Sequence, residues 1–315
     1  MTGAETGMAG TVYKQGWTLD DVAWGAFDSA RVTPELLAAV KAAALVEYNA
    51  ADYADYLHRI FRNSDPQTLA DIAAWGREEV QHGRALGRWC ELADPGFNFE
   101  SSVARFRAGY RPQHFMSEEQ ISVRGSRRGE MIARCVVESG TSSYYSAIRD
   151  AAAEPVLKEV AGRIAADEYR HYKLFLDILH RQNEPELPFW RRLLVAVTRV
   201  KESDDDELAY AYYAANMPPS APYDRVTCVR LSAARALSIY RPVHIKKLVQ
   251  MIAKAIGANP QGRTTRMAGT LVWRMLRIAV RTQAHQFECR VIALSIDQHQ
   301  IWADMAIAEI PPFAG

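Results

Sequence analysis

The sequence lacks the signals of several common protein classes. Its 4 cysteines form no Cys-x-x-Cys pair and are irregularly spaced, which argues against a zinc site or disulfide framework and fits a reducing compartment. No apolar run approaches the roughly 18 residues of a transmembrane helix, because Arg274 and Arg277 interrupt the most apolar late stretch. The N-terminal stretch is polar and glycine-rich, without the cationic start and apolar core of a signal peptide. We therefore expect a cytoplasmic protein.

Signals for β-structure are also scarce. Hydrophobic residues make up 49% and charged residues 24% of the 315 residues, which is typical of a soluble chain long enough for one large domain or two modest ones. Polar and apolar residues rarely alternate, and no Asn-Gly or Asp-Gly hairpin turn occurs. No Gly-x-Gly-x-x-Gly motif for a flavin or nicotinamide nucleotide is present. We predict an all-α fold.

Helix start signals divide the chain. Thr33–Glu35 and Asp65–Pro66 each provide an N-cap followed by proline at the first helical position. The first part contains helical patterns at about 33–63, 65–93, 117–152 and 154–182. An irregular, aromatic-rich connection is expected at about 95–116. Further helical patterns cover about 189–201, 206–216, 223–256 and 264–308.

These patterns predict three segments with different charge. Residues 1–32 form an N-terminal arm, residues 33–182 a four-helix bundle, and residues 183–315 a helical C-terminal extension that packs on the bundle. Within the extension, residues 222–290 contain 13 Lys/Arg and 2 Asp/Glu, although the whole chain has a net charge of only +1. Such a basic segment indicates either an acidic partner or solvated arginine faces. The arm is expected to be anchored by Trp17, Trp24 and Phe27.

Four glutamates and two histidines stand out by their spacing. Two of the glutamates have a histidine three positions later, which places both side chains on one helix face. The other two glutamates stand alone on separate predicted helices. The six residues are Glu47, Glu79, His82, Glu138, Glu168 and His171. Glutamate alone on two helices, and Glu-x-x-His on two others, is the ligand pattern of a di-metal carboxylate centre inside a four-helix bundle.

The heights of the glutamates along their helices also match. Glu47 and Glu79 are equally far in sequence from the turn near residues 63–64, one before it and one after it. Glu138 and Glu168 are placed in the same way about the turn near residue 153. At a rise of about 1.5 Å per residue, each hairpin places two acids at the same depth, about four helical turns from its connection. The alternative is that these acids face solvent on amphipathic helices, but apolar residues precede all four.

Burial of four acids requires counter-charge. Without it, their desolvation would cost many kcal/mol, whereas two bound cations would neutralise them. Carboxylate oxygens with only two imidazoles suit iron or manganese better than copper or zinc. The sequence does not separate these two metals. We expect two iron ions, because iron can activate O₂, with manganese as the alternative.

Three segments resemble a known family. Residues 75–83 read WGREEVQHG, residues 165–172 read AADEYRHY, and residues 138–141 read ESGT. They are similar to the EE-x-x-HG, ADE-x-RH and E-x-x-T segments of the soluble acyl-carrier-protein desaturases, which belong to the ferritin-like superfamily. The resemblance covers about residues 33–182 and implies a ferritin-like four-helix bundle. The sequence departs from the family at Gln81, where arginine is usual, and in its C-terminal half.

The resemblance implies a role for individual residues. The six glutamates and histidines would be iron ligands, with Glu79 and Glu168 bridging the metals. Thr141 would line the O₂ pocket. Asp167 would orient His82 and help to relay electrons to the metals. A surface tryptophan would complete that relay, and the candidates are Trp17, Trp24 and Trp75.

The leading hypothesis is an O₂-dependent di-iron oxidoreductase, similar to a desaturase, that acts on acyl chains carried by acyl carrier protein or coenzyme A. Its electrons would come from a ferredoxin-type donor, because the chain shows no nucleotide-cofactor motif. The basic segment would bind an acidic carrier protein through Arg225, Arg230, Arg235 and Arg241. A homodimer is expected, and no nucleic-acid partner.

Three alternatives remain. The same site could serve an oxygenase or N-oxygenase of a small metabolite, for which a short, closed, polar pocket would be evidence. A long apolar tunnel beside Glu138 and Thr141 would instead favour an acyl substrate. A non-enzymatic, ferritin-like iron-binding protein is the second alternative, although it needs no C-terminal extension. The third is peripheral contact of the basic late helices with a membrane surface.

Overall fold

The computed structural model describes residues 16–110, 121–202 and 206–278. Every regular element within these ranges is helical, so the predicted all-α class is confirmed for this part of the chain. The arm contains three short 3-10 helices, η1 (Leu19–Asp21), η2 (Trp24–Ala26) and η3 (Ser29–Arg31). Trp17 in the arm is buried, and Trp24 and Phe27 pack partly buried against the core.

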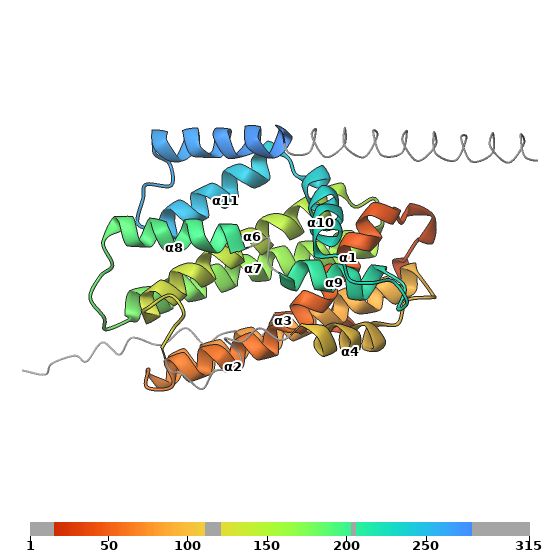
Figure 1. The fold of residues 1–315 in the computed structure, drawn as a ribbon, viewed down its shortest axis with the longest axis horizontal. Coiled ribbons are helices and arrows are strands. Elements are labelled where there is room, and N and C mark those ends of the chain that lie inside the picture. The colour runs from red at the N-terminus through yellow and green to blue at the C-terminus, as the bar shows by residue number, and fades with distance from the viewer. Residues whose placement is uncertain (1–15, 111–120, 203–205, 279–315) are drawn as a thin grey trace, which may run out of the picture.

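Two helical hairpins form the body of the protein. The first joins α1 (Pro34–Tyr48) and α2 (Ala50–Phe61) to α3 (Pro66–Ala93), and the second joins α6 (Arg127–Ala151) to α7 (Pro155–Arg181). Asp65 caps α3 by accepting a hydrogen bond from the Thr68 amide, and Glu154 caps α7 by accepting from the Val156 and Leu157 amides. Because α1 and α2 pack on α3, α6 packs on α7, and α3 contacts α7, the hairpins lie side by side (Figure 1).

The first predicted helix is interrupted at Asn49, which separates α1 from α2. Close packing occurs here, because a Cβ atom on Gly83 of α3 would lie 2.5 Å from the Tyr48 amide nitrogen. The Asn49 side chain donates a hydrogen bond to Glu207, 3.3 Å away. The break therefore coincides with a contact from the distant helix that contains Glu207. The local periodicity of the sequence does not indicate this break.

Three other helix predictions were wrong in their bounds. The connection at 95–116 contains a helix, α4 (Phe99–Gly109), which Asn98 caps and which Phe106 anchors in the core. The pattern at 223–256 is two helices, α10 (Arg225–Ile239) and α11 (Pro242–Ala255). Proline disfavours helical geometry in the residue before it, and Arg241 is extended. The helix predicted at 117–152 was also wrong in its start, because residues 121–126 are not helical and α6 begins at Arg127. Ser117 itself, and the part of the 264–308 pattern after residue 278, lie outside the described residues.

The later helices pack on one side of the two hairpins. They comprise α8 (Phe189–Lys201), α9 (Asp206–Asn216), α10, α11 and a helix at residues 263–278. Helix α9 contacts α1, whereas α8 and α11 contact α6. In Figure 1 these helices lie above and across the hairpins. No helix in the described ranges is long and apolar enough to cross a membrane.

The buried core consists of two clusters. One contains Leu45, Leu86, Trp89 and Ile164, and the other contains Phe61, Ile72, Met131 and Phe175. Along each long helix, the predicted glutamates and histidines fall between these two groups of residues. The polar site is therefore enclosed by apolar packing at both ends of the hairpins.

Candidate metal centre

The structure brings all six predicted metal-site residues together in the interior. Glu47 comes from α1, Glu79 and His82 from α3, Glu138 from α6, and Glu168 and His171 from α7. Each is at most 6% exposed, and both histidines are fully buried. These acids therefore do not face solvent, and the alternative of solvated amphipathic faces is wrong.

The six residues form two overlapping groups. One consists of Glu47, Glu79, His82 and Glu168, and the other of Glu79, Glu138, Glu168 and His171. Within each group the potential ligand atoms lie within 4.8 Å of one another. Glu79 and Glu168 belong to both groups, so their carboxylates stand between two adjacent positions for a cation. The arrangement is consistent with a metal site that holds two ions.

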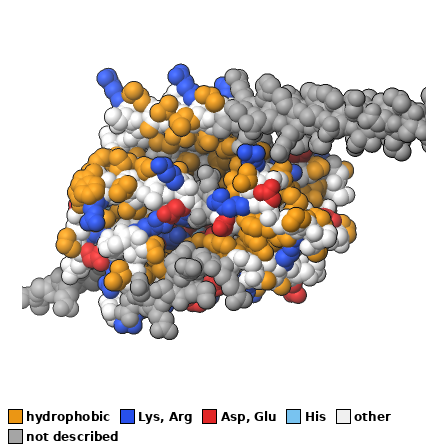
Figure 2. Space-filling view, viewed as in Figure 1, with side chains coloured by type: hydrophobic (Ala, Val, Ile, Leu, Met, Phe, Trp, Pro, Cys, Tyr) orange, Lys and Arg blue, Asp and Glu red, His pale blue; other side chains and the backbone are white. Residues whose placement is uncertain are grey.

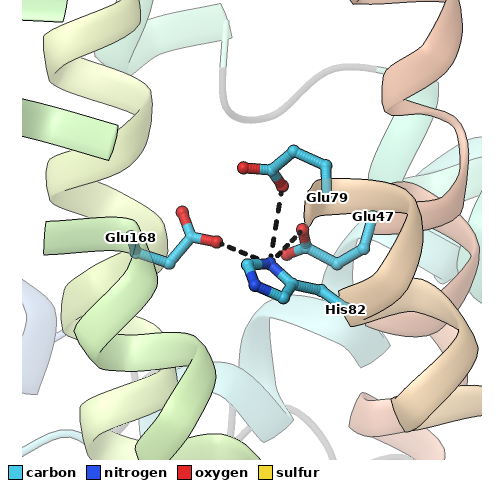
Figure 3. Close-up of side chains that lie close together, drawn as sticks. All are labelled: Glu47, Glu79, His82 and Glu168. Atoms are coloured by element: carbon cyan, nitrogen blue, oxygen red, sulfur yellow. Dashed lines mark ion pairs between the residues drawn. The ribbon is translucent and has the colours of Figure 1, made fainter. Parts of the chain in front are cut away.

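Each histidine turns one ring nitrogen toward the carboxylates. His82 Nδ1 lies 3.2 Å from Glu168 Oε1, 3.8 Å from Glu79 Oε2 and 3.9 Å from Glu47 Oε2. Figure 3 shows these three carboxylates directed toward the His82 ring from three different helices. On the other side, His171 Nδ1 lies 2.8 Å from Glu79 Oε1 and 3.6 Å from Glu138 Oε2.

The outer nitrogen of each histidine meets a second acid. His82 Nε2 lies 3.0 Å from Asp167 Oδ2, and His171 Nε2 lies 2.8 Å from Glu78 Oε2. Arg170 contacts both outer acids, donating to Asp167 and, at 3.4 Å, to Glu78. A carboxylate behind a histidine fixes the ring and its tautomer and leaves the inner nitrogen directed at a metal. Asp167 therefore lies where the sequence predicted it, and Glu78 is its equivalent on His171.

Two hydroxyl groups hold carboxylates of the site. Tyr145 is buried and donates to Glu47 Oε1 over 2.5 Å. Thr141 donates to Glu168 Oε2, and its oxygen also lies 3.3 Å from the Glu138 carbonyl. Each hydroxyl occupies one oxygen of its glutamate and leaves the other for a cation.

The electrostatics show how strongly the site needs positive charge. Burial and the neighbouring carboxylates raise the pKa values of Glu47 and Glu138 well above their usual range. Burial opposes ionisation of Glu79 as well, but contacts with His171 and the other neighbours lower its pKa to about 2. Burial disfavours the His82 cation, yet the hydrogen bond to Asp167 and the nearby carboxylates of Glu168 and Glu79 raise its pKa to about 9. Protons on some groups therefore balance the negative charge of others.

Unpaired atoms test whether these residues suit a metal. Thirteen buried side-chain atoms of the described residues have no hydrogen-bond partner in suitable geometry, and five of them belong to the site, namely Glu79 Oε1, His82 Nδ1, Glu138 Oε2, Glu168 Oε1 and His171 Nδ1. Buried polar atoms normally have partners, because an unsatisfied one costs about 1–3 kcal/mol. All five belong to the two groups that share Glu79 and Glu168. Bound cations would satisfy them together, so the donor set fits the expected metals.

Metal affinity should fall as the pH is lowered. In the metal-free protein, the pKa of His82 is raised to about 9, so this ligand carries a proton near neutral pH that metal binding must displace. The pKa values of Glu47, Glu138 and His171 are raised as well, which favours their protonated forms. For each proton that metal binding releases, the metal affinity should fall about tenfold for every unit by which the pH is lowered. Titration of the metal-free protein with Mn(II) between pH 6 and pH 8, in weak buffer, should show this slope and proton release. An affinity independent of pH would contradict the assignment.

A cavity of about 420 Å³ reaches the site. Glu138, Gly140 and Thr141 of α6 line it beside the carboxylate cluster, and its wall is mainly apolar. The later helices supply another part of the wall, through Val200, Leu208, Ala236, Tyr240, Leu248 and Ile252. A charged group that includes Arg134, Arg199, Glu202 and Glu207 also borders it. The C-terminal helices thus close the side of α6 on which a substrate could approach the metals.

Sequence reasoning missed several residues of this site. The sequence patterns assign no role to Glu78 or Tyr145. Arg170 was not considered. For Glu78, the available signal is its position as an acid directly before Glu79. Tyr145 lies seven residues, or about two helical turns, after Glu138, which places it on the same face of α6.

The chain matches no protein-family model and no curated protein sequence. Its function must therefore be inferred from the geometry of the site.

Proposed function

We propose that the protein is an O₂-dependent di-iron oxidoreductase built on a ferritin-like four-helix bundle, and that it acts on an acyl chain. One observation carries the proposal: two buried Glu/His groups share Glu79 and Glu168, and their glutamates line a mainly apolar cavity. Four carboxylates and two imidazoles favour iron or manganese over softer metals. The cavity gives such a centre access to C–H bonds.

In this proposal each side chain has a defined task. Glu79 and Glu168 would contribute to holding both ions, Glu47 and His82 would hold one ion, and Glu138 and His171 would hold the other. Bound as Fe(II), the pair would supply the O₂ activation that oxidation of an unactivated C–H bond requires. Thr141 holds one oxygen of Glu168, so this carboxylate keeps a fixed orientation at the cavity wall. Tyr145 does the same for Glu47.

The cavity favours an extended apolar substrate over a polar one. Its volume of about 420 Å³ lies within the range of about 300–1,000 Å³ found for ligand pockets. The lining residues of α6 run from Arg134 to Tyr145, which at about 1.5 Å per residue spans roughly 16 Å beside the carboxylates. An acyl chain placed there would pass Glu138 and Thr141. We propose delivery as a thioester of acyl carrier protein or coenzyme A.

The arm supplies a path for electrons into the site. Trp17 Nε1 donates to Asp167 Oδ2 over 2.7 Å, and the same oxygen lies 3.0 Å from His82 Nε2. The Trp17 ring also stacks on His82, with centroids 6.1 Å apart. Of the three candidate tryptophans, Trp17 alone is shown in contact with Asp167 among the described residues. We propose that a ferredoxin-type donor delivers electrons through Trp17.

Replacing Trp17 with phenylalanine should slow reduction of the metal centre about 10- to 100-fold, because it removes the hydrogen bond that holds Asp167 behind His82. Stopped-flow reduction of the oxidised protein by a small ferredoxin would measure the effect, with iron content determined in parallel. Trp24→Phe is the matched control, since Trp24 donates to the Leu19 carbonyl of the arm and, among the described residues, to no group of the site. Equal rates for both variants would remove Trp17 from the path.

Metal analysis with optical spectroscopy tests the proposal as a whole. The purified protein should contain two irons per chain, and the reduced protein should change its visible spectrum on exposure to O₂. Turnover with acyl thioesters of graded length, followed by mass spectrometry, should then give a product that has lost two hydrogens. Fewer than two irons per chain after reconstitution would overturn the di-iron assignment. A protein that contains two irons per chain but does not oxidise the acyl thioesters would overturn only the substrate assignment.

A second candidate is oxygenation of a small metabolite with a charged group. The charged residues in the cavity wall favour it, in particular Arg134, which lies one helical turn before Glu138 and is buried. Arg134 stacks on Tyr53 at 4.9 Å, and the Tyr53 hydroxyl donates to Glu207. Such a group could hold the polar end of a short substrate. Product mass separates the two candidates, since oxygenation adds the mass of an oxygen atom and desaturation removes that of two hydrogens.

A further inference from the structure

Helix α8 presents its apolar side outward. Five of its large apolar side chains are between 41% and 63% exposed: Phe189, Trp190, Leu193, Leu194 and Val197. At 3.6 residues per turn, these five occupy one continuous arc of about 140°. A helix that packs on a core normally buries such an arc. The outward arc of α8 is therefore a surface that needs its own explanation.

The inner side of α8 confirms this orientation. Ala196 is its only buried residue, and it packs with Ala255 and Ile256 at the end of α11. The two arginines nearest to that face, Arg192 and Arg199, are partly buried, and the Arg192 guanidinium lies against Gly257. Small and basic residues thus make the intramolecular contact, and the large apolar residues are left outside it.

A second helix carries a similar stripe. In residues 263–278, the exposed apolar side chains are Met267, Leu271, Met275 and Ile278, each between 59% and 72% exposed. Their spacing of four, four and three residues places them on one helix face. The helix rests on α11 through Gly269, which lies beside Lys246 and Val249. Its apolar face therefore points away from its support.

Both helices are basic as well as apolar. Residues 189–201 and 263–278 together contain 8 Arg/Lys and no Asp/Glu. Figure 2 shows hydrophobic side chains over α8 and over the helix at 263–278 on the same face of the molecule, with Lys and Arg among them. Exposed Trp and Phe beside arginine are typical of helices that lie in a membrane interface.

We propose that α8 and the helix at 263–278 bind the protein peripherally to an anionic phospholipid surface. Lipid headgroups would meet the arginines, and the two apolar stripes would enter the boundary between headgroups and acyl chains. A second copy of this chain would suit this surface less well than an anionic membrane, because the two contacting surfaces would both be positively charged. An acidic protein would match the charge, but it would also need apolar surfaces for two separate helices. The proposal does not depend on the metal site.

Vesicle flotation with the full-length protein tests this proposal. Binding is measured on vesicles of phosphatidylcholine alone and on vesicles of phosphatidylcholine mixed with anionic phosphatidylglycerol, at low and at high salt. We expect binding to the anionic vesicles at least tenfold stronger than to the neutral ones, and weakened by salt. Quenching of Trp190 fluorescence by brominated lipid should accompany binding. The Trp190→Phe variant should still bind but lose that quenching.

Surface variants connect binding to α8. The Trp190→Ser/Leu194→Ser variant should bind anionic vesicles at least tenfold more weakly. Leu92→Ser is the control, because Leu92 is a leucine with 41% exposure on α3. It should bind as the unaltered protein does. Circular dichroism and iron content should be unchanged in both variants, because the replaced side chains are exposed.

Three results would overturn the proposal. One is absence of binding to anionic vesicles. Another is equal loss of binding in the α8 variant and in Leu92→Ser. The third is a protein dimer, detected by analytical ultracentrifugation, that the α8 variant dissociates, since the face would then join two copies. If the protein binds the anionic vesicles but contains no iron, the membrane proposal stands and the proposed function fails.

Discussion

Replacing Glu168 with glutamine should lower the iron content from two ions per chain to well below one. Glu168 belongs to both groups of potential ligands, so its loss removes a donor from both ions at once. Glutamine has nearly the same size and can still accept the hydrogen bond from Thr141. The expected change therefore comes from the lost charge and not from a cavity. Iron analysis after anaerobic reconstitution measures it.

Glu47→Gln is the matched comparison, because Glu47 belongs to only one group. This variant should retain about one ion, held by Glu79, Glu138, Glu168 and His171. The metal-free Glu168→Gln protein should be no less stable than the metal-free unaltered protein, since one buried carboxylate fewer needs neutralisation. Thermal unfolding monitored by circular dichroism provides this reading. A marked loss of stability, with iron retained, would make Glu168 a structural residue.

Replacing Gly140 with leucine should reduce turnover of a long acyl chain roughly 100-fold while leaving both irons in place. Gly140 lines the cavity between Glu138 and Thr141, and a Cβ atom built on it meets no neighbouring atom within 4 Å. A leucine side chain can therefore extend into the cavity without displacing packed residues. It would occupy the path of the chain past the carboxylates. Product formation from acyl thioesters of several lengths measures the effect.

Gly140→Ala separates this blockage from a general effect on the helix. The alanine methyl group is small, so turnover should change little. Since glycine within a helix is less favourable than alanine, the free energy of unfolding should rise by about 0.5–1 kcal/mol. If Gly140→Leu turns over long chains as fast as Gly140→Ala, the cavity is not where the chain binds. Short chains that end before Gly140 should be less affected than long ones.

The meeting of the six glutamates and histidines could be predicted because it depends on local rules. Helix caps at Asp65 and Glu154 fixed the hairpin turns, and a regular rise per residue then fixed the relative heights of the acids. The break at Asn49 did not spoil this prediction, because Glu47 lies before it and the chain resumes a helix immediately. Whether a segment forms a helix, and how far a residue lies from the end of that helix, both depend on short stretches of sequence.

Contacts between distant helices could not be predicted in the same way. The bond from Tyr145 to Glu47, the contact of Glu78 with His171 and the placement of Trp17 behind Asp167 each join residues at least 93 positions apart. They depend on the rotation of each helix about its axis and on the course of the arm. The cavity wall depends on how α8–α11 pack, for which the sequence offered only a pattern of helices.

The origin of the cavity wall has a consequence for how this protein can diversify. All six candidate ligands come from residues 47–171, whereas α8–α11 supply much of the opposite wall. Substitutions in the later helices, such as at Ala236, Leu248 or Ile252, would reshape the chamber without touching a ligand. Selection could therefore change the shape of the cavity through one stretch of the gene and leave the candidate metal ligands in another unchanged.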